Sequence, residues 1–389
     1  MSARSKNKAE LSEKDLSRWK LIADFQKRLG CARQGSTLPS TQNDPRRLLS
    51  ETDYLSLLLF GLFNPVVESM RGLCAASRLR RVQEDVCSHP VSLGSFSEAQ
   101  SVVEPELLRK VFEELSSQSI GEPQGDQRLA PYQKVLMAVD STVWRALPRM
   151  TWALWRHQHG RECALRMHVK FNILEQKPAQ AIITPAKKCE RAALREHLQE
   201  GEFYVGDRNY GEDYALFGQM KERGASFVMR LREDAAVKVL KELPLSPLDR
   251  QADVISDAIV ELGTRNRDRS IPLRLVRILG EESQLLLVTD KESEELSAEL
   301  IALIYRNRWQ IELFFKWIKC ILGCRHWLAE SPRGVALQVY LALIAALLLQ
   351  NRTGRRPGKR AMEMIRFYLV GYADLDELCG ALGIKKNQA

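Results

Sequence analysis

Residues 135–144 read VLMAVDSTVW, and this stretch decides how the rest of the chain is interpreted. The run Val135–Val139 is apolar and ends at Asp140. A short apolar run that stops at a polar residue is typical of a buried strand. We therefore expect a strand here, with a carboxylate at its end.

The segments that follow predict a mixed sheet. Ala164–Leu174 alternates and is rich in residues that favour strands, and Ala181–Thr184 is a short strand candidate bounded by prolines. Three strands without an intervening helix indicate an antiparallel meander. Helices and strands then alternate: helices at 187–199 and 213–223, strands at 203–205 and 227–231. This order predicts an α/β fold with a ribonuclease-H-like mixed sheet.

The periodicity divides the chain into three regions. Residues 1–125 are expected to be a helical region with a basic start, since residues 1–50 hold eleven Lys and Arg against five Asp and Glu. Residues 126–330 would form the α/β domain, with a β-rich insertion at about 235–290 whose strands are expected at 254–262, 273–279 and 285–289. Residues 331–389 are expected to be helical.

The amino-acid composition indicates which kind of partner and which cellular compartment to expect. The chain has 58 Lys and Arg against 49 Asp and Glu, a net charge of +9, which suits a polyanion such as DNA. Its eight cysteines are scattered and indicate reduced thiols in a cytosol rather than a disulfide scaffold. The longest apolar run, 339–349, is shorter than the roughly 18 residues of a membrane span, so we expect a buried helix and no membrane partner.

A stripe of polar residues occurs in residues 305–320, YRNRWQIELFFKWIKC. On one continuous helix over 296–322, its four members would lie at roughly 0°, 300°, 340° and 320° around the axis. They are Tyr305, Arg308, Glu312 and Lys319. Such a face could hold a metal ion and phosphate oxygens. Equally, Arg308 and Glu312 could be an ordinary surface pair at i, i+4.

The two aspartates leave a similar choice open. Asp140 follows VLMAV and Asp207 follows FYVG. A carboxylate fixed at a strand end can point into a crevice and bind a metal ion. An aspartate at that place is also a common turn or N-cap residue.

Together these motifs resemble a known family. The DST at Asp140, the DRNY at Asp207 and the pattern Y-x2-R-x3-E-x6-K over 305–319 are similar to the DDE transposases of bacterial insertion sequences, in the group named for its Y-R-E-K signature. The resemblance runs from about Val135 to Lys319. It implies that Asp140, Asp207 and Glu312 hold two Mg²⁺ or Mn²⁺ ions, and a β-strand insertion is also a feature of this group.

The resemblance also implies roles for the neighbouring residues. Tyr305, Arg308 and Lys319 would contact phosphates of the transposon end. The family usually has glycine where this chain has Asn209. Because asparagine tolerates positive φ better than other non-glycine residues, a sharp turn could survive there.

The implied function is DNA transposition. The protein would bind terminal inverted repeats, nick, form a hairpin and join 3′ ends to target DNA, with at least a dimer on DNA. The basic N-terminal region is expected to recognise the ends with Arg71, Arg78, Arg80 and Arg81. Two alternatives are a catalytically silent, transposase-derived repressor and a metal-dependent nuclease that does not join strands.

Overall fold

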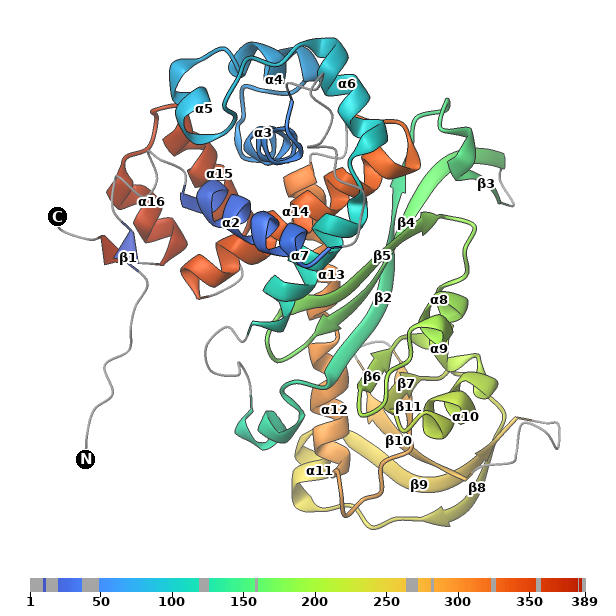
Figure 1. The fold of residues 1–389 in the computed structure, drawn as a ribbon. Coiled ribbons are helices and arrows are strands. Elements are labelled where there is room, and N and C mark those ends of the chain that lie inside the picture. Colours follow the sequence, from blue (N-terminus) through green and yellow to red (C-terminus); the bar gives the residue numbers. More distant parts are fainter. Residues whose placement is uncertain are drawn as a thin grey trace. The chain divides into compact units, whose positions relative to one another are not determined.

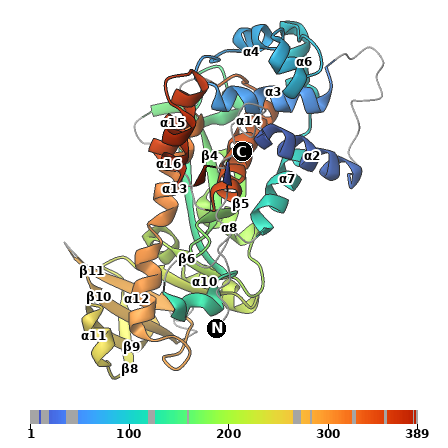
Figure 2. The ribbon, with the colours of Figure 1, turned by 90° about the vertical axis from the view of Figure 1, so that its left-hand side faces the viewer.

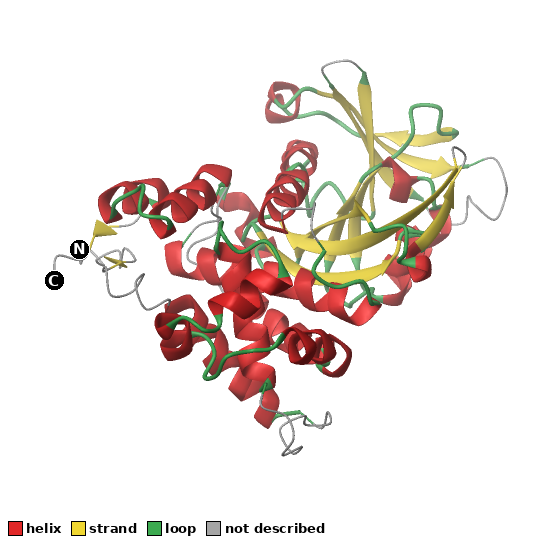
Figure 3. Cartoon of the chain, turned by 90° about the horizontal axis from the view of Figure 1, so that it is seen from above, coloured by secondary structure: helices red, strands yellow, loops and turns green. Residues whose placement is uncertain are grey.

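The computed structural model shows two compact units (Figure 1). It describes residues 10–11, 20–36, 49–118, 126–157, 160–263, 272–280, 283–322, 327–354, 358–383 and 385–386. The first unit comprises Met1–Gly121, Ala146–Trp152 and Phe315–Ala389, and the second comprises Glu122–Arg145 and Ala153–Phe314. The described strands gather in the second unit, apart from the short pair β1 (Glu10–Leu11) and β12 (Lys385–Lys386) (Figure 3).

The first unit is helical. Its helices are α2 (Lys20–Gln34), α3 (Glu51–Phe63), α4 (Met70–Ala76), α5 (Arg80–Asp85), α6 (Leu93–Val102), α7 (Pro105–Ser117), α14 (Pro332–Thr353), α15 (Lys359–Leu369) and α16 (Leu375–Leu382). The helical region predicted over 1–125 therefore contains six separate helices among its described residues, α2 to α7. Within that region, residues 1–9, 12–19, 37–48 and 119–125 lie outside the described part of the chain.

Helix α14 is the core of this unit and packs against α2, α3, α6 and α7. Ser331 caps its first turn by accepting a hydrogen bond from the Gly334 amide at 3.1 Å, and Gly354 ends it at φ 70°, where glycine is favoured. Among the described helices it alone is long and apolar enough to cross a membrane, and 83% of its most apolar stretch is buried inside the protein. It is the buried helix that its apolar run predicts.

The second unit contains a ten-stranded sheet in the order β3-β4-β2-β6-β7-β11-β10-β9-β8, with β5 paired to β4. Its first strands are β2 (Leu136–Arg145), β3 (Leu154–His157), β4 (Gly160–Asn172), β5 (Lys177–Pro185), β6 (Phe203–Gly206) and β7 (Ser226–Arg230). Strands β2, β4 and β5 pair antiparallel, whereas β2, β6 and β7 pair parallel. This is the ribonuclease-H-like arrangement that the sequence predicts.

Three short helices connect these strands: α8 (Glu190–Glu196), α9 (Arg208–Gly211) and α10 (Tyr214–Glu222). Apolar residues of α8 and α10 pack on the sheet, for example Leu194 and Phe217, the latter stacked on Phe227 with ring centroids 4.8 Å apart. Because α8 and α9 begin beside β2 and β6, their first residues reach the region around Asp140.

The predicted insertion is confirmed as strands. It contains β8 (Val237–Glu242), α11 (Pro247–Gln251), β9 (Val254–Leu262), β10 (Leu273–Leu279) and β11 (Gln284–Thr289). Strand β11 pairs with β7, so the insertion continues the main sheet rather than forming a separate one. The edge strand β8 was not predicted because most of its side chains are exposed and three of its six residues are charged.

The long helix expected over 296–322 is two helices, α12 (Ala298–Asn307) and α13 (Gln310–Leu322). At the junction the amides of Arg308, Trp309 and Ile311 each bond to the carbonyl three residues earlier. Such i to i+3 bonds tighten a helix and interrupt its regular turn. The helical-wheel angles predicted for one uninterrupted helix therefore do not apply across this junction.

The insertion anchors the start of α12, which lies along β9 and β10 (Figure 2). The buried Arg274 of β10 forms a two-pronged ion pair with Asp257 of β9, at 2.9 and 2.7 Å, and also donates to the Leu296 carbonyl. Asp249 accepts from the Glu299 amide at 2.8 Å. These contacts fix the helix that carries Tyr305 relative to the sheet.

Candidate active site

Asp140 and Asp207 occupy matching places on neighbouring parallel strands. Ala138 of β2 pairs with Val205 of β6, and each aspartate follows its paired residue by two positions. Strand β6 ends before Asp207, but β2 continues to Arg145 in antiparallel pairing with β4. The prediction that Asp140 ends its strand was therefore wrong. Asp140 lies instead just beyond the parallel pairing of β2 with β6, so both carboxylates lie at the same end of this strand pair.

The surroundings of Asp140 disfavour its charge. Its pKa is raised to about 7, chiefly by burial and also by the negative charges of Asp207 and Glu190, while the hydrogen bond from the Ser141 amide and the cation of Arg308 partly offset the increase. The Ser141 amide donates to Asp140 Oδ1 at 2.7 Å. A carboxylate crowded by other carboxylates in this way gains from a nearby cation.

Asp207 caps helix α9. Its Oδ1 accepts a hydrogen bond from the Asn209 amide at 3.0 Å, which is the usual geometry of an aspartate N-cap. Asn209 lies inside α9 and is not among the described non-glycine residues with positive φ, which are Gln176 and Asp253. The expected sharp turn at Asn209 is therefore absent, because the chain enters a helix there.

Arg308 lies between two carboxylates. Its Nη2 is 2.8 Å from Glu312 Oε1, and its Nη1 is 3.8 Å from Asp140 Oδ2. Its guanidinium also lies over the Tyr305 ring, 5.6 Å from the centroid. The structure therefore brings Tyr305, Arg308 and Glu312 together with Asp140 in spite of the helix junction.

The donor set suits a hard divalent cation. Carboxylate oxygens are the ligands that Mg²⁺ prefers, and Glu312 Oε2 is buried without a hydrogen-bond partner among the described residues. No three His, Cys, Asp or Glu side chains in the described part of the chain are gathered closely enough to hold a metal ion. The guanidinium of Arg308 supplies positive charge between Asp140 and Glu312 in this arrangement. The chemistry of the donors fits a cation, and bringing them around one would require Arg308 to move.

Lys319 follows Glu312 by seven residues on α13 and belongs to the first unit. Its side chain is half-buried and interacts with its neighbours. The four arginines expected to bind DNA lie on or beside α4 and α5, also in the first unit, and all are exposed. They are Arg71, Arg78, Arg80 and Arg81.

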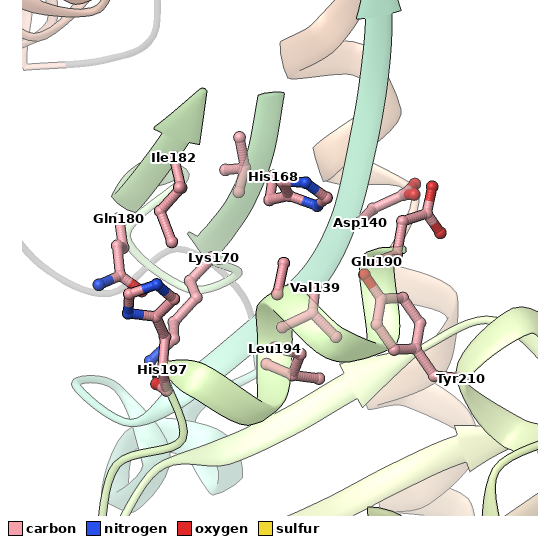
Figure 4. A pocket seen from close by; sticks show the side chains of 12 residues that line it. Val139, Asp140, His168, Lys170, Gln180, Ile182, Glu190, Leu194, His197 and Tyr210 are labelled. Carbon is pink, nitrogen blue, oxygen red and sulfur yellow. Dashed lines mark hydrogen bonds between the residues drawn. The ribbon is translucent and has the colours of Figure 1, made fainter. Parts of the chain in front are cut away.

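A fourth carboxylate, Glu190, was missed by the sequence analysis. It begins α8 and lies beside Asp140 (Figure 4). Its Oε1 accepts from the Ser141 hydroxyl at 2.5 Å and from Arg166, and its Oε2 accepts from the Asn209 amide group. A glutamate in the first turn of a helix is common, so no sequence pattern marks it as part of a site.

A small cavity of about 20 Å³ lies beside Asp140 and Glu190, between β4, β5 and α8 (Figure 4). His168 Nδ1 and Gln180 Oε1 belong to residues that line it, and neither atom has a hydrogen-bond partner among the described residues. The cavity has room for one water molecule. It is too small to admit a nucleotide, so any DNA must approach the carboxylates from outside.

Comparison with known proteins identifies the family. A family model described as a transposase DDE domain matches residues 131–348, more than half of the chain and all of the carboxylates described above. The chain belongs to the DDE transposase family. The predicted resemblance to the DDE transposases of insertion sequences is thereby confirmed.

Several relatives of this DDE transposase are themselves named as transposases. One from Sinorhizobium fredii is 29% identical over 239 residues, 60% of this chain and 64% of the relative. One for an insertion sequence element of Geobacillus stearothermophilus is 26% identical over 256 residues, covering 64% and 66%. One from Synechocystis is 23% identical over 325 residues, covering 80% and 85%. The match spans less than two thirds of the length of the first two relatives.

Among solved structures, a piggyBac transposase synaptic complex with hairpin DNA has a TM-score of 0.42 and 11% identity, over 96% of this chain and 85% of that chain.

Proposed function

We propose that this protein binds the terminal inverted repeats of an insertion sequence, cleaves DNA there and joins the 3′ ends to target DNA. The observation that carries the proposal is the placement of Asp140 and Asp207 two residues beyond paired positions of neighbouring parallel strands, with Glu312 linked to Asp140 through Arg308. Family membership supports the same reading.

Asp140, Asp207 and Glu312 would hold two divalent cations, Mg²⁺ or Mn²⁺. Such ions, when bound, activate a nucleophilic oxygen and stabilise the leaving oxygen of a phosphodiester. The protein's own part is to hold the carboxylates in position. The sheet fixes Asp140 and Asp207, while α12 and α13, anchored by the insertion, fix Glu312.

The cations around the carboxylates suit a phosphate. Arg308 presents a forked guanidinium that can grip two phosphate oxygens, and it is held in place by Glu312 and the Tyr305 ring. We propose that Tyr305, Arg308 and Lys319 act as the Y-R-E-K group does, contacting phosphates at the transposon end. A phosphate arriving at Arg308 would draw its guanidinium away from Asp140.

The exposed arginines of α4 and α5 are proposed to recognise the terminal repeats. Arg71 and Arg81 are exposed on short helices, and Arg78 is exposed in the turn between these helices. Arg80 forms an ion pair with the exposed Glu84 of the next turn. Such arginines can bind phosphates at little desolvation cost. Because transposition requires two ends to be held together, we propose that two copies act on one pair of ends.

The direct test uses the full chain and double-stranded DNA carrying the ends of its own element, with Mg²⁺ or Mn²⁺. We expect a nick that frees a 3′-hydroxyl, then a hairpin, then joining to a target plasmid, each resolved on denaturing gels. Binding without cleavage would favour the repressor alternative. Cleavage without joining would favour the nuclease alternative, and either result would contradict the proposal.

A further inference from the structure

Glu190 connects the two aspartate segments. One of its oxygens accepts from the Ser141 hydroxyl, in the residue directly after Asp140. The other accepts from the side-chain amide of Asn209, two residues after Asp207. A single carboxylate therefore spans the gap between β2 and α9.

The same two partner residues also hold the aspartates. The backbone amide of Ser141 donates to Asp140 at 2.7 Å, and the backbone amide of Asn209 donates to Asp207 at 3.0 Å. Each partner thus uses its backbone for an aspartate and its side chain for Glu190. Any shift of Glu190 would be passed to both aspartates through one intervening residue.

The charge of Glu190 is balanced inside the protein. Arg166 of β4 forms an ion pair with its Oε1, and both side chains are largely buried, at 15% and 16% exposure. A buried carboxylate with a cationic partner and two further donors has its oxygens well satisfied, so its position is fixed. Glu190 is therefore held by β2, β4 and α9 at once.

The link between Glu190 and α9 depends on the side chain of Asn209. Glycine, which the family usually has at this position, carries no side chain and could not reach Glu190. The departure from the family pattern therefore adds a link between α8 and α9 instead of removing one. This link is a property of this chain's own sequence.

We infer that Glu190 is a positioning residue for the active site, setting the separation of Asp140 and Asp207 through Ser141 and Asn209. The inference rests on the proposed function, because positioning matters only if the aspartates act together. Supporting groups of this kind commonly change metal affinity or rate by about 10- to 100-fold when they are removed.

Two variants of the full chain test the inference. Glu190→Gln removes the negative charge that pairs with Arg166 and replaces the acceptor oxygen facing the Asn209 amide group by an NH2 donor. The double variant Ser141→Ala with Asn209→Ala removes both links but keeps the ion pair of Glu190 with Arg166, so that neither buried charge loses its partner of opposite charge. The matched control is Glu196→Gln, which makes the same charge change on α8 at an exposed pair with Lys188.

We expect both test variants to need about tenfold more Mn²⁺ for half-maximal cleavage of end DNA, and to show a smaller rise in melting temperature on adding Mn²⁺ without DNA. For the double variant, binding of end DNA should match that of Glu196→Gln, and the melting temperature without metal should stay above the assay temperature. If the double variant needs no more Mn²⁺ for half-maximal cleavage than Glu196→Gln does, the inference is overturned.

The outcome separates this inference from the proposed function. If Asp140→Ala and Asp207→Ala abolish cleavage while the double variant behaves as the control does, the proposed function stands and the positioning role falls. If Asp140→Ala or Asp207→Ala also cleaves normally, the proposed function fails and the inference falls with it.

Discussion

Arg308 Nη2 lies 2.8 Å from Glu312 Oε1 across the junction between α12 and α13. The same guanidinium reaches toward Asp140, and its pKa is raised by Tyr305, Glu312 and Asp140 in spite of burial. An ordinary exposed i, i+4 pair contributes a few tenths of a kcal/mol to a helix. The contact with Asp140 indicates a larger role, because it ties the helix junction to the sheet.

We predict that Arg308→Ala lowers the rate of single-turnover cleavage about a hundredfold, the cost typical of removing a donor that stabilises developing charge. Binding of end DNA should change little, because many distant contacts share it. Thermal unfolding would show that the protein stays folded at the assay temperature. The control is Arg306→Ala, an exposed neighbour paired with Asp253, and equal rates in the two variants would refute the phosphate role.

If the exposed arginines bind phosphates, the affinity for end DNA should depend on them and on the salt concentration. Replacing Arg71, Arg78, Arg80 and Arg81 by alanine should weaken binding of end DNA and reduce the slope of log affinity against log salt, by up to about 0.9 for each phosphate that is no longer neutralised. Fluorescence anisotropy over a salt series measures both. Lys221→Ala with Arg223→Ala, exposed in the second unit, is the comparison. Its slope should stay closer to that of the unaltered protein, and an equal reduction there would speak against a special role for α4 and α5.

The buried ion pair of the insertion should be costly to break. Asp257→Ala leaves the Arg274 guanidinium, 2% exposed, without its carboxylate, and we expect the free energy of unfolding to fall by about 3–5 kcal/mol. Urea unfolding measures this. Glu261→Ala, which breaks a pair with the exposed Lys238 in the same sheet, should cost about 1 kcal/mol or less. Similar costs for the two would show that α12 is not anchored as described.

The buried His168 should make the protein sensitive to acid. Burial lowers its pKa from 6.5 to about 4, helped by the nearby cations Arg166 and Lys188. Between these values the unfolded chain binds a proton that the folded protein does not, so the free energy of unfolding should fall as the pH drops from about 6.5 to 4, by at most about 1.4 kcal/mol per pH unit. The loss should be smaller for His168→Gln.

Urea midpoints at pH 4.5 and 6.5 provide the measurement for His168→Gln. The control is His89→Gln, at an exposed position in the first unit. It should keep the full acid sensitivity of the unaltered protein. If His168→Gln loses as much stability in acid as this control, the titration of His168 is not the cause.

Much of the fold could be predicted because it depends on local patterns. Alternation and apolar runs place the strands at 254–262 and 273–279 where the structure has β9 and β10. The edge strand β8 could not be recognised in this way, since its exposed side chains leave no apolar face. The break at Arg308 also leaves no mark in the periodicity, because apolar residues continue on both sides of it.

Part of the candidate site could also be predicted, because some of its residues occur in local sequence patterns. Fixed spacing selects Arg308 and Glu312, and the ends of two short apolar runs select Asp140 and Asp207. Glu190 comes from a different element, and its importance lies in contacts with Ser141, Arg166 and Asn209 that only the folded chain brings together. No spacing along the sequence could have indicated them.

The central claim is that Asp140, Asp207 and Glu312 bind the divalent ions used in cleavage, and exchanging their ligand atoms tests it most directly. A thiolate binds Mg²⁺ poorly and Mn²⁺ better. For Asp140→Cys, Asp207→Cys and Glu312→Cys, we predict loss of cleavage with Mg²⁺ and partial recovery with Mn²⁺ in at least one cysteine variant, with no recovery in the matching alanine variants and unchanged binding of end DNA. Cleavage with Mg²⁺ at the normal rate in any of the three would contradict the account.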